Sequence, residues 1–195
     1  RRSDSLYVSL QPRWWGGGAN TFAANLTRYA KRRGLPLARR MEQARRAIVI
    51  SHLADEAEVA RAKAAGCAII HRIDEDFNWG QDDPYRREKH DKIRRLNRLA
   101  DITVFQSRFV EANLLETLNP ARHTVILNGA DPSVFKPACR PGEWIGHVTW
   151  STGEKKRLDL LYRCIESHPD RKFLLVGRHA QSSLPFGRLP NVKLV

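Results

Sequence analysis

Short apolar segments alternate with amphipathic helical segments along this chain, and this alternation restricts its possible folds more than any other feature. The expected strands are residues 6–10, 47–51, 67–70, 102–105 and 124–127, and the expected helices are about residues 21–33, 55–65 and 109–118, with another that begins at Pro84. Strands that are apolar throughout are typical of parallel sheets covered by helices on both faces. The sequence therefore predicts an α/β fold with a Rossmann-like parallel sheet and right-handed crossover connections.

The pattern breaks between residues 136 and 142, where two prolines interrupt any periodicity. A strand at 145–149, a helix at 158–167 and strands at 173–176 and near 192–195 are expected to follow. We therefore predict an amino-terminal domain of residues 1–137 and the beginning of a second Rossmann-like domain at residues 138–195. The second domain is expected to be incomplete, because so few elements cannot close a hydrophobic core.

The formal net charge of +13 is the feature of the composition that points to a partner. Basic residues cluster at 31–33, at 39–46 and at 86–98. Such clusters favour nucleic acid, an anionic membrane face or a phosphorylated substrate. They are equally typical of solvated helix faces, so charge alone does not choose among these alternatives.

The cysteines and the apolar segments restrict the cellular setting. Cys67, Cys139 and Cys164 are too far apart in sequence to build a zinc site or a disulfide framework. No apolar run approaches the roughly 20 residues that cross a bilayer. We therefore expect a reduced, cytoplasmic setting.

Polar residues follow the predicted strands, and ligands of parallel α/β sheets bind outside the carboxyl ends of the strands. These residues are 16–20, 52, 71–76, 106–107 and 128–131. The run Gly16-Gly17-Gly18 lies between a strand and a helix, where glycines allow close backbone approach and a helix start offers N–H groups to an anion. A plain tight turn is an equally good interpretation of this run.

A second candidate site begins at His71 and Arg72, which are followed by Asp74, Glu75 and Asp76. The histidine could orient a sugar hydroxyl or stabilise developing positive charge, and the arginine could hold a phosphate. Alternatively, Arg72 forms an ion pair with a nearby aspartate that only fixes a loop. A metal site built from Asp74 and Asp76 is disfavoured.

Several motifs, taken in order, resemble the family-four glycosyltransferases. They are the glycine-rich loop, the segment from Ala100-Asp101 to Ser107, the stretch Asn128-Gly129-x-Asp131-x-x-x-Phe135-x-Pro137, the segment Lys155-Lys156-Arg157 before a leucine-rich helix, and Phe173 to Gly177. The asparagine-glycine stretch is the most specific of these, and it lies where that family passes from one domain to the other. The resemblance extends over nearly the whole chain.

This resemblance implies a two-domain GT-B fold that binds the acceptor mainly in the first domain and a nucleotide-sugar in the second. The implied reaction is sugar transfer with retention of configuration, without a cofactor and usually without a metal. His71 would lie near the transferring sugar, Gly17 and Gly18 would approach the donor phosphates, and Lys156 would neutralise the leaving diphosphate. The further substrate-binding or donor-binding candidates are Asn20, Arg72, Asp74, Ser107, Asn128, Gly129, Asp131 and Lys155.

The sequence also departs from the family pattern. Ser151 stands where the family usually has an arginine, Arg157 stands where it has a glycine, and the paired glutamates that normally bind the donor are absent. The alternative is therefore a non-catalytic module that uses its basic surface for nucleic acid or an anionic membrane. Nucleic acid is disfavoured, because aromatic residues are not interleaved with the basic runs. For an enzyme, the same basic clusters suggest a phosphorylated or membrane-borne acceptor and a peripheral position at the inner membrane face.

Overall fold

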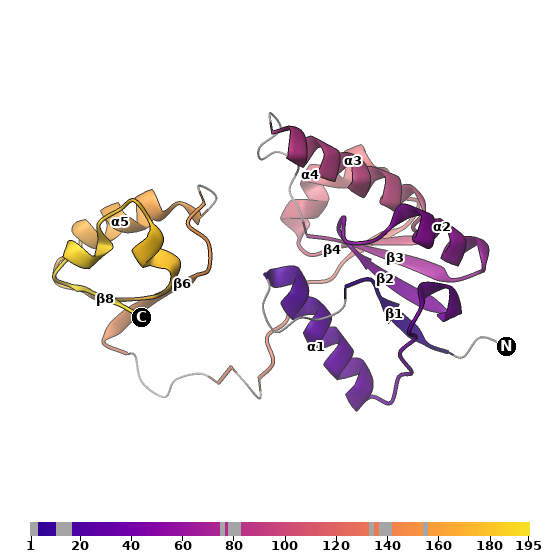
Figure 1. The fold of residues 1–195 in the computed structure, drawn as a ribbon, viewed down its shortest axis with the longest axis horizontal. Helices are drawn as coiled ribbons and strands as arrows, with labels where there is room; N and C mark the ends of the chain where they lie inside the picture. Colours follow the sequence, from indigo (N-terminus) through magenta and orange to yellow (C-terminus); the bar gives the residue numbers. More distant parts are fainter. Residues whose placement is uncertain are drawn as a thin grey trace. The chain divides into compact units, whose positions relative to one another are not determined.

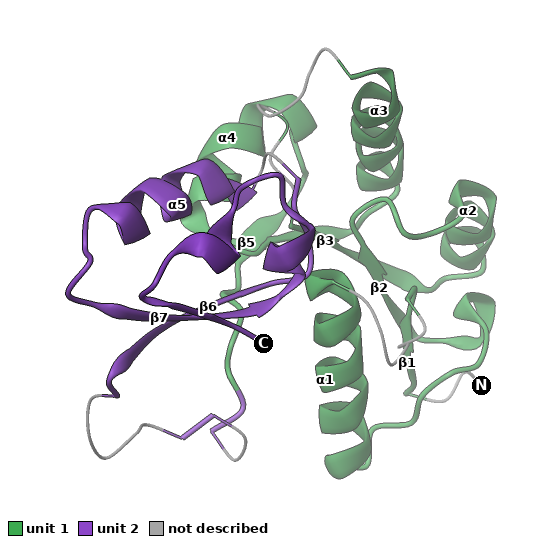
Figure 2. Cartoon of the chain, turned by 60° about the vertical axis from the view of Figure 1, so that its left-hand side comes forward, with its two compact units in different colours: residues 1–130 green, residues 131–195 purple. Residues whose placement is uncertain are grey.

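The computed structural model describes residues 4–10, 17–74, 77, 83–132, 135–136, 142–153 and 156–195. The chain divides into two compact units, Arg1–Ala130 and Asp131–Val195 (Figure 2). The boundary expected from sequence, after Pro137, falls a few residues further along the chain. Each unit has its own parallel sheet, and each is described on its own below.

The first unit contains a sheet of five parallel strands in the order β1-β2-β3-β4-β5 (Figure 1). The strands are β1 (Leu6–Val8), β2 (Arg46–Ile50), β3 (Ala68–Ile73), β4 (Ile102–Phe105) and β5 (His123–Val125). The helices are α1 (Gly18–Arg32), α2 (Glu56–Ala64), α3 (Pro84–Arg98) and α4 (Arg108–Leu118). The predicted α/β fold with a parallel sheet is confirmed.

Helices cover both faces of this sheet. Successive side chains of a strand point to opposite faces, so alternate residues of one strand pack against different helices. On β2, Ala47 and Val49 belong to a buried cluster with side chains of α2 and α3. Ile48 and Ile50 pack instead with Ala23 and its neighbours on α1. Figure 1 shows α1 on one side of the strands and α2, α3 and α4 on the other.

The chain does not pass directly from β1 to its neighbour β2, because the segment after α1 first pairs with the opposite edge of β1. After α1, Leu37 pairs with Leu6 on the edge of β1 that faces away from β2, where Leu6 N–H donates to Pro36 O and Ala38 N–H donates to Leu6 O. The chain then runs across the face of the sheet opposite to α1, where Met41 packs in the buried cluster under α2. The chain thus leaves β1 and β2 toward opposite faces, and such a switch point is where open α/β sheets bind ligands.

Local capping explains where α2, α3 and α4 begin and where α4 ends. Asp55, Asp83 and Ser107 each accept a backbone N–H in the first turn of α2, α3 and α4, respectively. Asn119 ends α4 in the left-handed conformation, with a φ of 41°. The positions of these helices therefore agree closely with the sequence pattern.

Two elements differ from the prediction in ways that affect the candidate site. Helix α1 begins at Gly18 rather than near residue 21, so the glycine-rich run enters its first turn. Strand β3 extends to Ile73, whereas the apolar pattern placed its end before His71. His71 and Arg72 are therefore inside the strand, on opposite faces of the sheet, and not in a loop after it.

The described residues of the second unit form three parallel strands, β6 (Trp144–Thr149), β7 (Lys172–Gly177) and β8 (Val192–Leu194). They also form the α-helix α5 (Leu158–Glu166) and two short 3-10 helices, Arg178–Gln181 and Phe186–Arg188. Its core joins Phe173 and Leu175 of β7 to Leu158 and Ile165 of α5 and to Phe186. This small parallel sheet is consistent with a Rossmann-like unit. No helix in the described ranges of either unit is long and apolar enough to cross a bilayer.

Candidate functional site at the carboxyl edge of the first sheet

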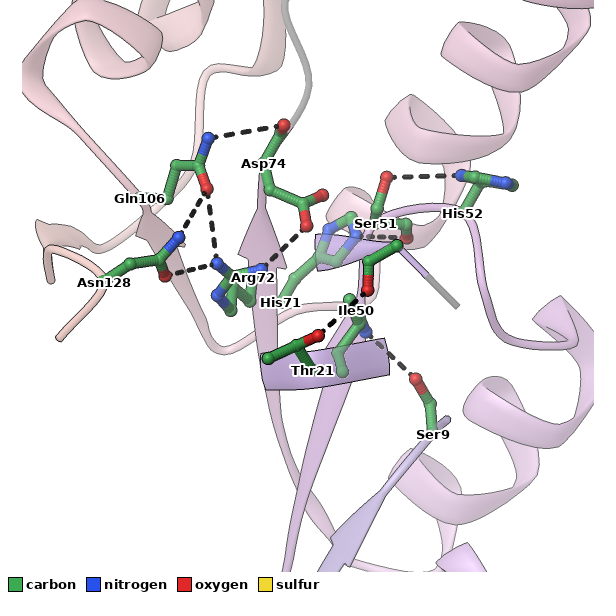
Figure 3. Close-up of polar contacts among 11 residues, drawn as sticks. Ser9, Thr21, Ile50, Ser51, His52, His71, Arg72, Asp74, Gln106 and Asn128 are labelled. Atoms are coloured by element: carbon green, nitrogen blue, oxygen red, sulfur yellow. Dashed lines mark hydrogen bonds and ion pairs between the residues drawn. The ribbon is translucent and has the colours of Figure 1, made fainter. Parts of the chain in front are cut away.

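Strand β2 ends at a buried serine in the left-handed conformation. Ser51 has a φ of 49° and is 1% exposed. This conformation costs a residue with a Cβ about 1–2 kcal/mol. Two hydrogen bonds of 2.8 Å hold it: Ser51 N–H donates to Arg72 O, and Ser51 O contacts His71 Nε2 (Figure 3). Ser51 thereby turns the chain out of β2 at the switch point and presents His52, whose Nδ1 lies 3.3 Å from Ser51 Oγ.

His71 is the side chain that supports this turn. Its ring is fully buried, with Nε2 2.8 Å from Ser51 O and Nδ1 3.1 Å from the Asn97 side-chain amide. Because the carbonyl can only accept, Nε2 carries the hydrogen and Nδ1 accepts from Asn97, which also donates to the Thr103 hydroxyl. Burial lowers the pKa of His71 from 6.5 to about 4, although the hydrogen bond to Ser51 opposes this shift. His71 is therefore neutral near pH 7.

This environment bears on the catalytic role that the resemblance implies for His71. Both ring nitrogens are engaged by the protein, and the ring has no exposed surface. A group in contact with a sugar would need at least one nitrogen directed at the ligand. The arrangement supports a positioning role for His71, exerted through Ser51, rather than direct contact with a substrate.

On the opposite face of β3, Arg72 is the centre of a polar network (Figure 3). It is 4% exposed and donates to Asp74 Oδ2 at 2.8 Å, Asn128 Oδ1 at 2.8 Å and Gln106 Oε1 at 3.3 Å. The guanidinium also lies over the ring of Phe22 on α1, 3.8 Å from its centroid. We call these four polar residues the Arg72 network. It joins the carboxyl ends of β3, β4 and β5, and Phe22 links it to α1.

The charge of this network indicates which ligands it could bind. The Arg72–Asp74 ion pair, which the sequence offered as an alternative to phosphate binding, is present at 2.8 Å. A guanidinium neutralised in this way has little charge left for a phosphate. The second oxygen of Asp74, Oδ1, is buried and has no hydrogen-bond partner within the described residues. A carboxylate oxygen in this state favours a ligand hydroxyl or N–H donor.

The amino-terminal end of α1 offers a different chemistry. Gly17 is its N-cap, no side chain caps the helix, and its first turn contains no acidic residue. The N–H groups of Asn20 and Thr21 donate to Gly17 O. In the described part of the chain, no hydrogen bond engages the N–H groups of Gly18 and Ala19. A helix start with open N–H groups suits a phosphate.

Replacing Gly18 with alanine distinguishes an effect on the stability of the fold from an effect on phosphate binding at the start of α1. A Cβ at Gly18 would meet no atom within 4 Å, so we expect the free energy of unfolding to stay constant or to rise by up to about 1 kcal/mol. The same Cβ would keep a phosphate from approaching the backbone, so affinity for a nucleoside diphosphate should fall about tenfold. Denaturant unfolding and calorimetric titration measure the two effects. Gly146→Ala, which also adds a Cβ in open space but on β6, is the control, and an equal loss of affinity in both variants would contradict this role.

The other candidates in the first unit do not join the network directly. Ser107 accepts the backbone N–H of Val110 and so caps α4. Asn20 lies in the first turn of α1, and Gly129 is exposed beside Asn128. The candidates that the fold brings together are therefore Arg72, Asp74 and Asn128, with Gln106 as an additional member.

The remaining candidates belong to the second unit or lie outside the described residues. Asp131 begins the second unit, and Lys155 falls outside the described residues. Lys156 is exposed, and its backbone N–H donates to Gly153 O at 2.9 Å. Burial lowers the pKa of His147, and the charge of Lys156 lowers it further. Lys156 thus lies close enough to β6 to influence its side chains.

Sequence reasoning missed several residues that shape these sites. Asn97 follows Leu96 and is one turn after Ile93, so its position on the buried stripe of α3 was a signal that could have identified it. His147 and His179 form a contact of 2.7 Å between Nδ1 and Nε2 in the second unit, and no sequence spacing connects them. Within the described ranges, no group of three His, Cys, Asp or Glu residues is placed to hold a metal.

No protein-family model matches this chain, and no curated protein is significantly similar to it. The resemblance to the family-four glycosyltransferases therefore depends on the quoted motifs alone.

Proposed function

We propose that this protein is a GT-B-type glycosyltransferase that transfers a sugar from a nucleotide-sugar donor with retention of configuration. The observation that carries the proposal is the Arg72 network. It connects Arg72 and Asp74 with Asn128, the first residue of the most specific motif of the resemblance. Asn128 is far from Arg72 and Asp74 in sequence, and the motifs by themselves do not imply its contact with Arg72.

Hydroxyl recognition is the role proposed for the network. Asp74 Oδ1 is buried in the ligand-free protein, so the carboxylate would turn toward the ligand to accept a hydrogen bond from a sugar hydroxyl, while Arg72 keeps its hold on the other oxygen. Gln106 and Asn128 fix the orientation of the guanidinium, since both accept from it. A site with fixed acceptors discriminates strongly against ligands that lack the matching hydroxyl.

Phosphate recognition is proposed for the start of α1 and for the loop before α5. As the bond to the sugar breaks, negative charge develops on the diphosphate, and cations or backbone N–H groups placed there lower the barrier. Gly17 and Gly18 leave the start of α1 open to such a group. Lys156, with Lys155 beside it in sequence, would supply the ammonium charge. The proposal includes no cofactor, and the acceptor would be a phosphorylated or membrane-borne molecule.

The experiment that tests this function measures binding and turnover of nucleotide-sugars by the whole chain. A panel of uridine, guanosine and adenosine diphosphate sugars is titrated by calorimetry, and release of the nucleoside diphosphate is followed. We expect one nucleotide class to bind. Lys156→Ala should weaken that binding about tenfold or more, because a charge-assisted hydrogen bond contributes about 1.5–3 kcal/mol.

Lys193→Ala is the matched control for this experiment, since Lys193 is an exposed lysine on β8 of the same unit. Its affinity for the donor should equal that of the wild type. Absence of binding by any nucleotide-sugar would contradict the proposed function. Equal losses in the two lysine variants would mean only that general charge attracts the donor.

A further inference from the structure

The carboxyl-terminal end of α1 and the segment after it form a basic surface remote from the Arg72 network. Residues 5–41 contain no acidic residue. We call residues 29–40 the basic tip; its cations are exposed, and they are Lys31, Arg32, Arg33, Arg39 and Arg40. In both views of the first unit, this end of α1 extends past the strands of the sheet (Figures 1 and 2).

The basic tip also presents apolar side chains in a fixed conformation. Gly34 has a φ of 67° and donates its N–H to Lys31 O, while Leu35 N–H donates to Ala30 O at 2.9 Å. This pair of hydrogen bonds is the Schellman motif that ends many helices. Leu35 is nevertheless 45% exposed, and Tyr29, near the same end of α1, is 53% exposed. About half of the surface of each of these two side chains is therefore open to solvent.

The cations of the basic tip differ from those of α3 in their pairing. Within the described residues, no ion pair joins Lys31, Arg33, Arg39 or Arg40 to a carboxylate. Much of the charge on α3 is compensated, by the pairs Arg86–Asp83, Arg94–Asp91 and Arg95–Glu56. Lys31, Arg33, Arg39 and Arg40 thus keep their charge for an external partner, whereas much of α3 is a solvated face with internal pairing.

We propose that the basic tip docks the protein on the surface of an anionic lipid bilayer. Cations near such a surface are attracted to its headgroups, and exposed Leu35 and Tyr29 would enter the headgroup boundary between them. Nucleic acid fits less well, because the phosphate backbone gains nothing from Leu35, and the one tyrosine ring is already approached by Arg33, 5.2 Å from its centroid. The inference does not depend on the proposed sugar transfer, since the tip is at the other end of α1 from Gly18.

The test is co-sedimentation of the whole chain with vesicles of phosphatidylcholine alone or with about one third phosphatidylserine, at about 0.15 M salt. We expect binding only to the anionic vesicles. Each cation near the surface contributes about fivefold in affinity, so Arg33→Gln with Arg39→Gln should weaken binding about 25-fold. Leu35→Ser, which leaves the charge unchanged, should weaken it about tenfold through loss of apolar insertion.

Arg87→Gln with Arg98→Gln on α3 is the matched control, because it removes the same charge from exposed positions elsewhere on the unit. It should bind the anionic vesicles nearly as well as the wild type. The proposal is overturned if the two double variants lose affinity equally, or if Leu35→Ser binds like the wild type. It is also overturned if the basic tip binds a single-stranded RNA homopolymer while anionic vesicles are not bound.

Discussion

Replacing Arg72 with methionine is expected to lower the free energy of unfolding by about 3–5 kcal/mol, because it leaves the buried carboxylate of Asp74 without its cation. Asp74 and Arg72 have side chains that are 14% and 4% exposed, so solvent screens their interaction little. Asn128 and Gln106 would lose a donor in the same variant. Denaturant unfolding followed by circular dichroism measures the change.

A double variant separates the ion pair from general packing. Arg72→Met with Asp74→Leu removes both charges, and much of the lost stability should return. Arg94→Met on α3 is the control, since the ion pair of Arg94 with Asp91 is partly exposed and should contribute no more than about 1 kcal/mol. If Arg72→Met costs as little as Arg94→Met, the Arg72 network does not hold the strand ends together.

The second large effect is a dependence of stability on pH that arises from His71. Its pKa in the folded protein, about 4, is below the ordinary value of 6.5, so the unfolded chain binds more protons between these values. Stability from this group is fully present above pH 6.5 and is lost as the pH falls toward 4. The shift corresponds to about 3 kcal/mol.

His71→Gln tests the assignment, because glutamine keeps an amide donor for Ser51 O but does not titrate in this range. The variant should lose the part of the pH dependence between 6.5 and 4 that belongs to His71. Burial lowers the pKa of His147 and His179 as well, so the informative quantity is the difference between wild type and variant. His168→Gln, a substitution at an exposed position, is the control variant. If the free energy of unfolding of His71→Gln depended on pH in the same way as that of the wild type, this would contradict a buried neutral imidazole.

The element positions of the first unit could largely be predicted from the sequence, because its helices carry local stop and start signals. Asp55, Asp83 and Ser107 act through contacts a few residues away, so the pattern contains the information needed. The end of β3 could not be predicted in this way. His71 and Arg72 look like loop residues, and only contacts with Ser51, Asn97 and the strand ends make them strand residues.

The candidate site could be predicted in part. The rule that ligands bind at carboxyl strand ends selected Arg72, Asp74 and Asn128, which the fold does bring together. The positioning role of His71, exerted through Ser51, could not be foreseen, since it depends on the left-handed turn of Ser51. Phe22 falls within the helix predicted at about residues 21–33, but its position against Arg72 depends on the packing of α1 against the sheet.

The most direct test of the proposed ligand site is a titration of the isotopically labelled protein with the nucleotide-sugar that binds most tightly, followed by amide and arginine side-chain NMR spectra. Shifts concentrated at Gly17, Gly18, Arg72 and Asp74 are the predicted result. Asp74→Asn should abolish the shifts at Arg72 while leaving those at Gly18 in place. Shifts confined to other parts of the chain, with these residues unchanged, would contradict a ligand site at the carboxyl edge of the first sheet.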